Sequence, residues 1–378
     1  MLTILLLILV ALLPGSATAG GTKADRITET GTLLWQGKPF FPIGIYNVNP
    51  TAAEYRTLAA NGFNMIQGMF PVKLDAFRKS LDLALASNIA VDVPLYVGDQ
   101  VLEDLAPSLR TLNLAANHPA VLDWKILDEP DAESHASIRD EVPDAYLALK
   151  AVHPEQLFEL TLSDTHTFSY WSRCCDIIQV DRYPLPSKPL TEVYEFCRDA
   201  KNAKAPWQPL IFVVQCGWTA DLKTQPTFNQ ARAMVYLALI GGAKGISWYS
   251  RQETAQDGKI IWDLTTSPLW PRLKEINSEI QSLALPILLG EEITGITSQP
   301  CCVYVVGKRW QGRLYLLISN PGDTSADAEI TLPPEMRVES VRAIGLSGNP
   351  TLDGANLRVP LGPIDSGTVI CDIAAPSS

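Results

Sequence analysis

Histidine and positive charge are scarce in this chain. Its 378 residues include 4 histidines, and 30 lysines and arginines stand against 41 aspartates and glutamates, which gives a formal net charge of −11. Phosphate contacts need a basic face, so this charge balance excludes an electrostatic nucleic-acid binder. An acidic surface also gives no attraction to anionic lipids or to polyanionic substrates. We therefore expect no nucleic-acid partner.

Long apolar segments and phosphate-binding loops are also missing. After its first residues the sequence has no uncharged apolar stretch of the roughly 20 residues that a membrane helix needs, so no stable membrane insertion is expected. It contains neither a G-x-G-x-x-G nor a Walker A sequence, and so nothing indicates a nucleotide cofactor. Hydrophobic residues nevertheless make up 47% of the chain. That content excludes disorder and predicts a globular fold with a large core.

The first 19 residues are typical of a signal peptide. The apolar run Ile4–Leu13 is followed by Ala17-Thr18-Ala19, an A-x-A cleavage sequence. The alternative is a membrane anchor, but the run is about half the length of a membrane span. We expect cleavage near Ala19 and a secreted or periplasmic protein.

The seven cysteines suit an exported protein but not a metal site. None of them has the C-x-x-C spacing of zinc sites or thioredoxin-type motifs. Candidate disulfides join Cys301 or Cys302 to Cys371, and Cys174 or Cys175 to Cys197. The alternative is that all seven are buried thiols.

From residue 40 onward, eight short apolar runs alternate with amphipathic segments. The runs span 40–48, 63–70, 90–97, 121–127, 157–162, 176–183, 210–215 and 245–249. They have the length of strands and lack strict alternation, as expected for strands buried on both faces. Helices are predicted at 51–60, 73–87, 100–117, 132–152, 227–240 and 271–284. Eight alternations over about 245 residues predict a (β/α)₈ TIM barrel, with a doubly wound open sheet as the alternative.

Beyond about residue 290 the pattern changes to short strands between turns. Runs at 301–307 and 313–319 flank the turn Lys308–Gly312 and predict a hairpin. Further strands are expected at 328–332, 338–344, 355–360 and 368–373. We predict a small C-terminal antiparallel β-sandwich. The domains are then a signal peptide at 1–19, a barrel at 20–289 and a sandwich at 290–378. The barrel would begin with a short β element over residues 20–39, with Gly37-Lys38 as its turn.

Active sites of (β/α)₈ barrels lie at the C-terminal ends of the strands. The predicted ends carry carboxylates, amides and aromatic rings, and no histidine cluster, so we expect neither a metal ion nor an organic cofactor. Rings stack on the apolar faces of sugars, and amides and carboxylates bind hydroxyl groups, so this set favours a carbohydrate site. The candidate residues are Tyr46, Asn47, Gln67, Tyr96, Asp128, Glu129, Asp164, Asp181, Tyr183, Gln215, Trp218, Trp248 and Tyr249.

Three strand segments resemble clan-A glycoside hydrolases. HPAVLDWKILDEP, residues 118–130, is similar to that clan's fourth strand, which ends in Asn-Glu-Pro or a variant. DIIQVDRYP at 176–184 and GISWY at 245–249 are similar to its sixth and eighth strands. The resemblance implies that Glu129 is the general acid/base and that Asp128 contacts the 2-hydroxyl of the sugar. The alternative is that both residues form the acidic start of a helix.

The seventh strand departs from that clan, because it ends in Gln215 where the nucleophilic glutamate is expected. An amide does not form the usual glycosyl ester. The alternative candidates for the base or nucleophile are Asp181 and, behind it, Asp164 or Glu253. A separation from Glu129 of about 6.5–9.5 Å would indicate inversion, and about 5–5.5 Å retention.

Two further alternatives remain open. The 2-acetamido group of the substrate would be the nucleophile in an N-acetylhexosaminidase-type reaction, with Asp128 orienting it and Tyr183 or Tyr249 assisting. Otherwise the barrel binds glycans without cleaving them. The sequence thus predicts an O-glycosyl hydrolase, and the charge of −11 favours neutral or N-acetylated glycans over anionic polysaccharides.

Overall fold

The computed structural model describes residues 25–68, 74–95, 106–217, 224–254, 259–353 and 356–374. The predicted signal peptide, Tyr96 and Trp218 lie outside these ranges. The chain divides into two compact units. The first contains Met1–Asp181, Asp199–Val213 and Gly245–Ile261, and the second contains Arg182–Arg198, Val214–Lys244 and Trp262–Ser378.

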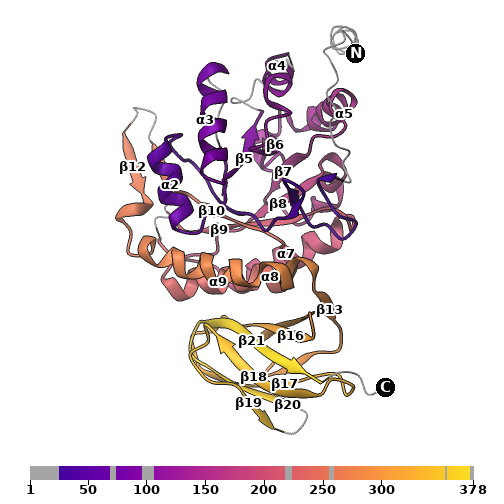
Figure 1. Ribbon diagram of the computed structural model, residues 1–378, viewed down its shortest axis with the longest axis vertical. Helices are drawn as coiled ribbons and strands as arrows, with labels where there is room; N and C mark the ends of the chain where they lie inside the picture. Colours follow the sequence, from indigo (N-terminus) through magenta and orange to yellow (C-terminus); the bar gives the residue numbers. More distant parts are fainter. Residues whose placement is uncertain are drawn as a thin grey trace. The chain divides into compact units, whose positions relative to one another are not determined.

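An eight-stranded parallel sheet forms the centre of the fold. Its order is β3 (Ile43–Ile45), β10 (Ile246–Tyr249), β9 (Leu210–Gln215), β8 (Ile177–Asp181), β7 (Phe158–Leu162), β6 (Val121–Asp128), β5 (Ala90–Pro94) and β4 (Met65–Ile66). Figure 1 shows β5, β6 and β7 as neighbours. The backbone nitrogen of Gln67 donates to the carbonyl of Ile45 at 3.0 Å and so joins the two ends of this order. The predicted barrel is confirmed, and the open sheet is not found.

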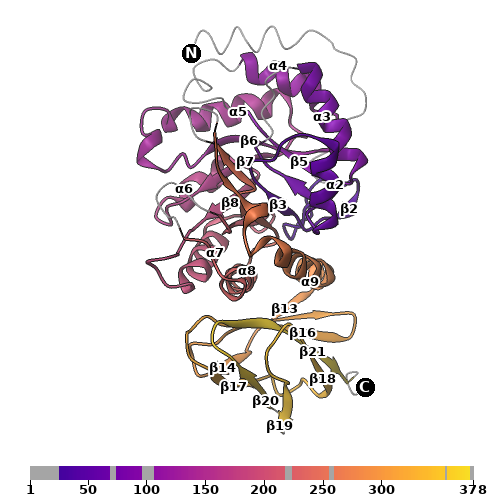
Figure 2. The same cartoon turned by 90° about the vertical axis from the view of Figure 1, so that its left-hand side faces the viewer.

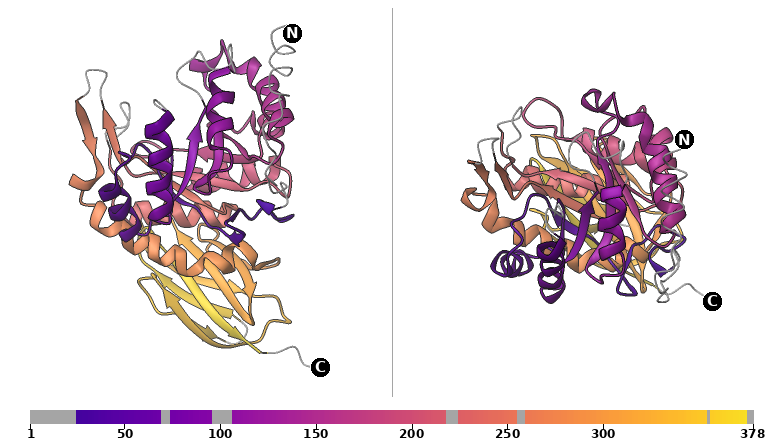
Figure 3. Two further views of the ribbon diagram at one scale, coloured as in Figure 1. Left: turned by 45° about the horizontal axis from the view of Figure 1, so that its top comes forward. Right: turned by 90° about the horizontal axis from the view of Figure 1, so that it is seen from above.

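The helices of the first unit follow the predicted pattern, with one shortened start. They are α2 (Ala52–Ala60), α3 (Leu74–Ala86), α4 (Ala106–Ala115), α5 (Val142–Val152) and the single turn α6 (Phe168–Trp171), which leads into the 3₁₀ turn η5 (Ser172–Cys174). Figure 3 shows α2 and α3 side by side. A helix was predicted over 132–152, but the 3₁₀ turns η3 (Glu133–His135) and η4 (Arg139–Glu141) replace its first half. Pro143 occupies the first turn of α5, where its missing N–H is tolerated, and so the helix begins beside it.

The N-terminal lead closes the lower end of the barrel. Strands β1 (Leu34–Trp35) and β2 (Lys38–Pro39) form a hairpin. Its turn is Gln36-Gly37, with φ of 52° and 73°, one residue earlier than predicted. Leu33, Trp35 and Phe40 of this lead pack against apolar residues at the starts of the strands. These residues are Met65, Ala90, Leu122, Leu157, Ile177 and Ile211. The N-terminal ends are therefore filled largely with apolar side chains, and Arg26 of the lead donates there to the carbonyl of Val121 at 3.1 Å.

The second unit holds helices and the C-terminal strands. Helix α7 (Thr191–Ala203), which the sequence pattern did not single out, begins in this unit. Helix α8 (Phe228–Gly241) begins with a Thr227–Gln230 capping box, and α9 (Trp270–Leu289) follows it. A hydrogen bond of 3.0 Å between the hydroxyls of Tyr236 and Thr368 joins α8 to β21. Figure 2 shows α8 and α9 next to the C-terminal strands.

Two antiparallel sheets make up the predicted sandwich. One has the order β13 (Glu291–Ile293), β15 (Tyr304–Trp310), β16 (Arg313–Asn320), β21 (Asp365–Ile373) and β18 (Val338–Ile344). The other has the order β14 (Thr297–Gln299), β17 (Ala326–Thr331), β20 (Asn356–Leu361) and β19 (Thr351–Asp353). Between α8 and α9 the chain forms β10, the pair β11 (Gln252–Thr254) and β12 (Ile260–Asp263), and η6 (Leu264–Thr266). The sandwich is confirmed, whereas the domain limits at 289 and 290 stay a prediction.

Two further observations concern export and membranes. None of the seven cysteines, all of which lie in the described ranges, forms a disulfide bond, so the candidate bridges are not present. Cys371 and Cys197 are buried, whereas Cys301 and Cys302 are exposed. Among the helices described, none combines the length and apolar character that crossing a bilayer requires.

Candidate active site

Glu129 follows the last residue of β6 in an unusual backbone conformation. Its φ is 48°, in the left-handed region that residues other than glycine seldom adopt. The backbone nitrogen donates to the carbonyl of Thr161 at 3.0 Å, and the carbonyl oxygen accepts from Nδ1 of His135 at 2.8 Å. Strained backbone held in this way is concentrated at functional sites. No helix begins at this point, since η3 starts only at Glu133, so the reading as the acidic start of a helix is not supported.

The carboxyl groups of Glu129 and Asp181 are hydrogen-bonded to each other. Burial raises the pKa of both groups, and the negative charge of Glu129 raises the pKa of Asp181 further. Asp181 is 7% exposed, and its Oδ1 has no hydrogen-bond partner among the described residues. Two close carboxyl groups, of which Asp181 is buried and Glu129 half-buried, favour a state that shares a proton, and so this pair is suited to acid catalysis.

Hydrogen-bonded carboxyl oxygens lie closer than the separations of inverting or retaining pairs, which are about 6.5–9.5 Å and 5–5.5 Å. The choice between inversion and retention stays a prediction.

Asp128 lies beside this pair and faces a buried lysine. A bulge in the pairing of β6 with β7 lies between Lys125 and Leu127. It shifts the alternation by one residue, so that Lys125 and Asp128 share a face. Lys125 Nζ lies 3.3 Å from Asp128 Oδ1, and the side chains are 2% and 39% exposed. Asp128 is therefore a partly exposed carboxylate that contacts the buried ammonium group of Lys125.

Lys125 is surrounded by oxygen atoms. Its Nζ donates to Thr161 Oγ1 at 2.8 Å, to Gln179 Oε1 at 3.1 Å and to the hydroxyl of Tyr46. Burial by itself lowers the pKa of Lys125, but Tyr46 and the carboxyl groups around it more than reverse this effect and leave the pKa well above its usual range. Lys125 is therefore an ammonium ion inside the barrel, and it stabilises nearby negative charge.

Gln67 and Tyr46, both predicted to contact substrate, support this network. Gln67 donates to Asp92 Oδ2 at 2.9 Å and accepts from Gln179 Nε2 at 3.2 Å. Tyr46 donates to Gln179 Oε1, and both Tyr46 and Gln67 are buried. Hydrogen bonds within the network, several of them to Gln179, therefore occupy the polar groups of both side chains.

The strand-eight side presents Tyr249, Asn47 and Glu253. Asn47 Nδ2 donates to Glu253 Oε1 at 3.1 Å, and the hydroxyl of Ser250 also donates to that oxygen. The rings of Tyr46 and Tyr249 meet edge to face at 5.5 Å. Burial, and then Glu253, raise the pKa of Tyr249, which therefore stays a neutral hydroxyl. Because Tyr249 is only partly buried, it remains a candidate for substrate contact.

Trp248 and Gln215 occupy positions that do not suit direct substrate contact. Trp248 is 0% exposed, so its ring has no free face for stacking on a sugar. The amide of Gln215 donates to the carbonyl of Leu185 and accepts from its backbone nitrogen, both at 3.1 Å. Both polar groups of the Gln215 side chain are therefore occupied by the backbone of Leu185.

The remaining predicted residues are dispersed. The backbone nitrogen of Asp164 donates to Asp131 Oδ2 at 2.8 Å, and its own carboxylate accepts from the backbone of His166 at 3.0 Å. These bonds shape the loop after β7. Tyr183 belongs to the second unit, and Tyr96 and Trp218 lie outside the described residues.

Sequence reasoning missed the polar residues inside the strands. They are Asp92, Asp123, Lys125, Glu159, Thr161 and Gln179, all buried. The available signal was a spacing of two within an apolar run, as in Asp123 and Lys125 or Gln179 and Asp181. In a strand this spacing places both side chains on one face.

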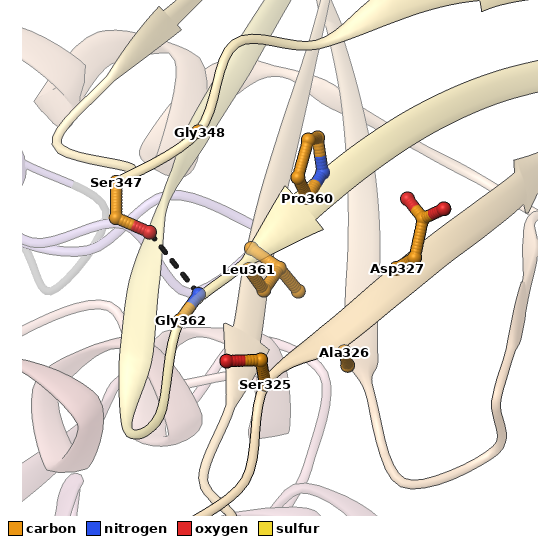
Figure 4. Close-up of a pocket in the computed structure, with 8 residues that line it drawn as sticks. All are labelled: Ser325, Ala326, Asp327, Ser347, Gly348, Pro360, Leu361 and Gly362. Atoms are coloured by element: carbon orange, nitrogen blue, oxygen red, sulfur yellow. Dashed lines mark hydrogen bonds between the residues drawn. The ribbon is translucent and has the colours of Figure 1, made fainter.

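A cavity of about 580 Å³ on the sandwich is not a second catalytic site. It is lined by Ser325, Ala326, Asp327, Ser347, Gly348, Pro360, Leu361 and Gly362. In Figure 4 the Ser347 hydroxyl accepts from the backbone nitrogen of Gly362, at 3.1 Å. This lining offers one carboxylate, Asp327, and no pair of acids, so acid–base chemistry has little support there.

The fold is that of the (β/α)₈-barrel glycoside hydrolases, with a β-sandwich after the barrel. No protein-family model matches the chain, and no curated protein matches its sequence. Among solved structures, an α-amylase from Geobacillus thermoleovorans in complex with acarbose is 12% identical, covers 89% of this chain and 99% of its own, and has a TM-score of 0.58.

Two further solved structures belong to the same fold group. A maltogenic α-amylase from Thermotoga neapolitana is 11% identical, with coverage of 87% and 98% and a TM-score of 0.58. A glycoside hydrolase family 30 xylanase from Clostridium acetobutylicum is 10% identical, with coverage of 92% and 99% and a TM-score of 0.51. These likenesses confirm the predicted resemblance at the level of the fold.

Proposed function

We propose that the chain is an O-glycosyl hydrolase acting on neutral or N-acetylated oligosaccharides or polysaccharides. The observation that carries the proposal is the hydrogen-bonded pair of Glu129 and Asp181 at the carboxyl end of the barrel, with both pKa values raised. A carboxyl group that stays protonated near neutral pH is what a glycosidase needs to protonate the leaving oxygen. The solved structures of the same fold include enzymes named as amylases and a xylanase.

In the proposed reaction Glu129 gives its proton to the glycosidic oxygen while the bond from that oxygen to the anomeric carbon breaks. Before substrate binds, Asp181 shares this proton with Glu129. Water adds to the anomeric carbon and loses one proton to a carboxylate of the site, from which the proton returns to the pair, so the acid is restored.

The second group is proposed to be Asp128, whose carboxylate Lys125 holds at 3.3 Å. It would either accept the proton of the attacking water or orient the 2-acetamido group of an N-acetylated sugar. Gln215 is engaged with the backbone of Leu185, which favours a mechanism without a nucleophile on the seventh strand. Export with cleavage near Ala19 is part of the proposal, because polymeric glycans are met outside the cell.

The test is hydrolysis by the wild type and by Glu129→Gln on a panel of aryl glycosides and neutral polysaccharides. We expect Glu129→Gln to lower kcat/KM by about 10²–10⁴-fold on substrates with poor leaving groups. The loss should be smaller with an activated aryl leaving group, which needs no proton. Glu133→Gln, at an exposed residue four positions later, is the matched control and should keep full activity.

Two results would overturn the assignment. If turnover survives Glu129→Gln on every substrate, another group is the acid. If the wild type binds glycans in calorimetry but cleaves none of them, the barrel is a glycan-binding protein.

A further inference from the structure

Three carboxylates meet in the interior of the barrel at a place that the proposed reaction does not use. Asp92 on β5, Asp123 on β6 and Glu159 on β7 each offer an oxygen, and these three oxygens lie within 4.8 Å of one another. All three residues are 0% exposed. They come from three adjacent strands of the sheet, so their meeting depends on the curvature of the barrel.

Asp123 lacks the donors that a buried carboxylate requires. No backbone, hydroxyl, amide or ammonium group of the described residues donates to either oxygen of Asp123 or to Asp92 Oδ1, and Asp123 and Asp92 hydrogen-bond to each other only when the two carboxyl groups share a proton. Glu159 receives no well-directed hydrogen bond either, although Lys125 Nζ lies 3.1 Å from its Oε1. Buried polar atoms are nearly always satisfied, because leaving them without partners is costly.

The charges of the cluster do not balance. Three carboxylates carry −3 when ionised, and Lys125, which lies 3.8 Å from Asp92 and 3.1 Å from Glu159, supplies +1, while the guanidinium of Arg26 also acts on Asp123. Burial raises the pKa of all three acids, that of Glu159 to about 8. The three acids thus outnumber the cations beside them, and the remaining negative charge requires protons or a bound cation.

We propose that Asp92, Asp123 and Glu159 bind one divalent cation, and that calcium fits the site best. All the donors are carboxylate oxygens, which hard cations prefer, whereas zinc selects nitrogen and sulfur. Oxygens that lie within 4.8 Å of one another can contact one cation, and calcium accepts irregular sets of oxygen ligands at about 2.3–2.6 Å. Magnesium requires a tighter octahedron of about 2.1 Å and keeps several waters.

This cation has a structural role. Asp123 lies on β6 and precedes Glu129, which follows the end of that strand, by six residues, which corresponds to roughly 15–20 Å along an extended chain. It therefore lies well below the Glu129–Asp181 pair. The cation neutralises the cluster and cross-links β5, β6 and β7, and it takes no part in proton transfer.

The experiment is elemental analysis of the full chain, purified without chelators, together with thermal unfolding. We expect about one calcium per chain. Removal with EDTA should lower Tm by about 5 °C or more, and excess calcium chloride should restore it. Asp123→Asn should lose the metal and make Tm insensitive to both EDTA and calcium.

Asp176→Asn is the matched control. Asp176 is also a fully buried aspartate of the barrel, but it pairs with Lys150 at 3.2 Å, so this variant should keep its calcium. If Asp123→Asn does not fold, the effects of EDTA and calcium on the wild type still decide the question. A wild type that contains no divalent cation, and whose Tm does not respond to calcium, would overturn the proposal and leave protons as the balancing charge.

Discussion

Glu129 and Asp181 hold each other through a hydrogen bond between their carboxyl groups, one just after β6 and the other at the end of β8. Burial raises both pKa values, and the pair therefore resists full ionisation at neutral pH. The other titratable groups that act on Glu129 are Asp128 and Asp131, which raise its pKa, and His135, which lowers it.

Asp181→Asn should shift the alkaline limb of the kcat/KM profile to lower pH. In the wild type the last proton of the pair is lost late, because the negative charge of one carboxylate raises the pKa of the other. With asparagine at 181 that charge is gone, and the proton is lost at the pKa of Glu129 alone. We expect a shift of about 1–3 pH units, measured on an activated aryl glycoside.

The same variant should change how stability depends on pH. Carboxyl groups whose pKa is raised in the folded state bind more protons than in the unfolded state. The free energy of unfolding of the wild type therefore falls as pH rises from about 4 through the raised values. Asp181→Asn should flatten this slope. Asp140→Asn, at an exposed residue, should change neither profile. An unaltered alkaline limb in Asp181→Asn would contradict the shared proton.

Lys125→Met should destabilise the fold strongly. The methionine keeps most of the side-chain volume but leaves Glu159, Asp92 and Asp128 without the ammonium that lies 3.1–3.8 Å away. Removing one partner of a buried ion pair costs about 3–5 kcal/mol. The measurement is urea unfolding, and Lys274→Met, at an exposed lysine of α9, should be neutral. A loss as small as that of the control would show that Lys125 does not stabilise the acids.

Gln215→Glu should not create a nucleophile on the seventh strand. A glutamate there loses the amide that donates to the carbonyl of Leu185 at 3.1 Å and places a buried charge against that oxygen. We expect a loss of about 1–3 kcal/mol or more in urea unfolding. No covalent glycosyl-enzyme should be found by mass spectrometry with a slow substrate. A stable variant that accumulates such an adduct would mean that Gln215 occupies a vacated nucleophile position.

The positions of the barrel strands could be predicted from the sequence, because they depend on local hydrophobic periodicity. Each of the eight apolar runs overlaps a strand of the sheet, and Glu129 was placed after the fourth run by counting alone. The predicted positions of turns were less accurate, because a shift of one residue changes which residues form the turn. The hairpin between β15 and β16 turns at Gln311-Gly312, with φ of 48° and 75°, in a narrower loop than the predicted Lys308–Gly312.

The candidate site could be predicted only in part from the sequence. Spacing placed Glu129, Asp128 and Asp181 at strand ends, but it did not show that Glu129 and Asp181 touch or that Trp248 is fully enclosed. The cluster of Asp92, Asp123 and Glu159 escaped notice because each acid lies alone within an apolar run. Two such runs are separated by a helix, which hides the contact from any local pattern.

By itself the sequence determined the class of fold, the order of its strands and the end of the barrel at which Glu129 lies. Hydrophobic period and turn residues act over a few positions, and those features follow from them. Only the tertiary structure decided which buried polar groups meet. Barrel closure joins β3 to β4, and the bulge between Lys125 and Leu127 turns Asp128 towards Lys125. A shift of one residue in register sends a side chain to the opposite face, so these contacts depend on strand pairing over the whole ring.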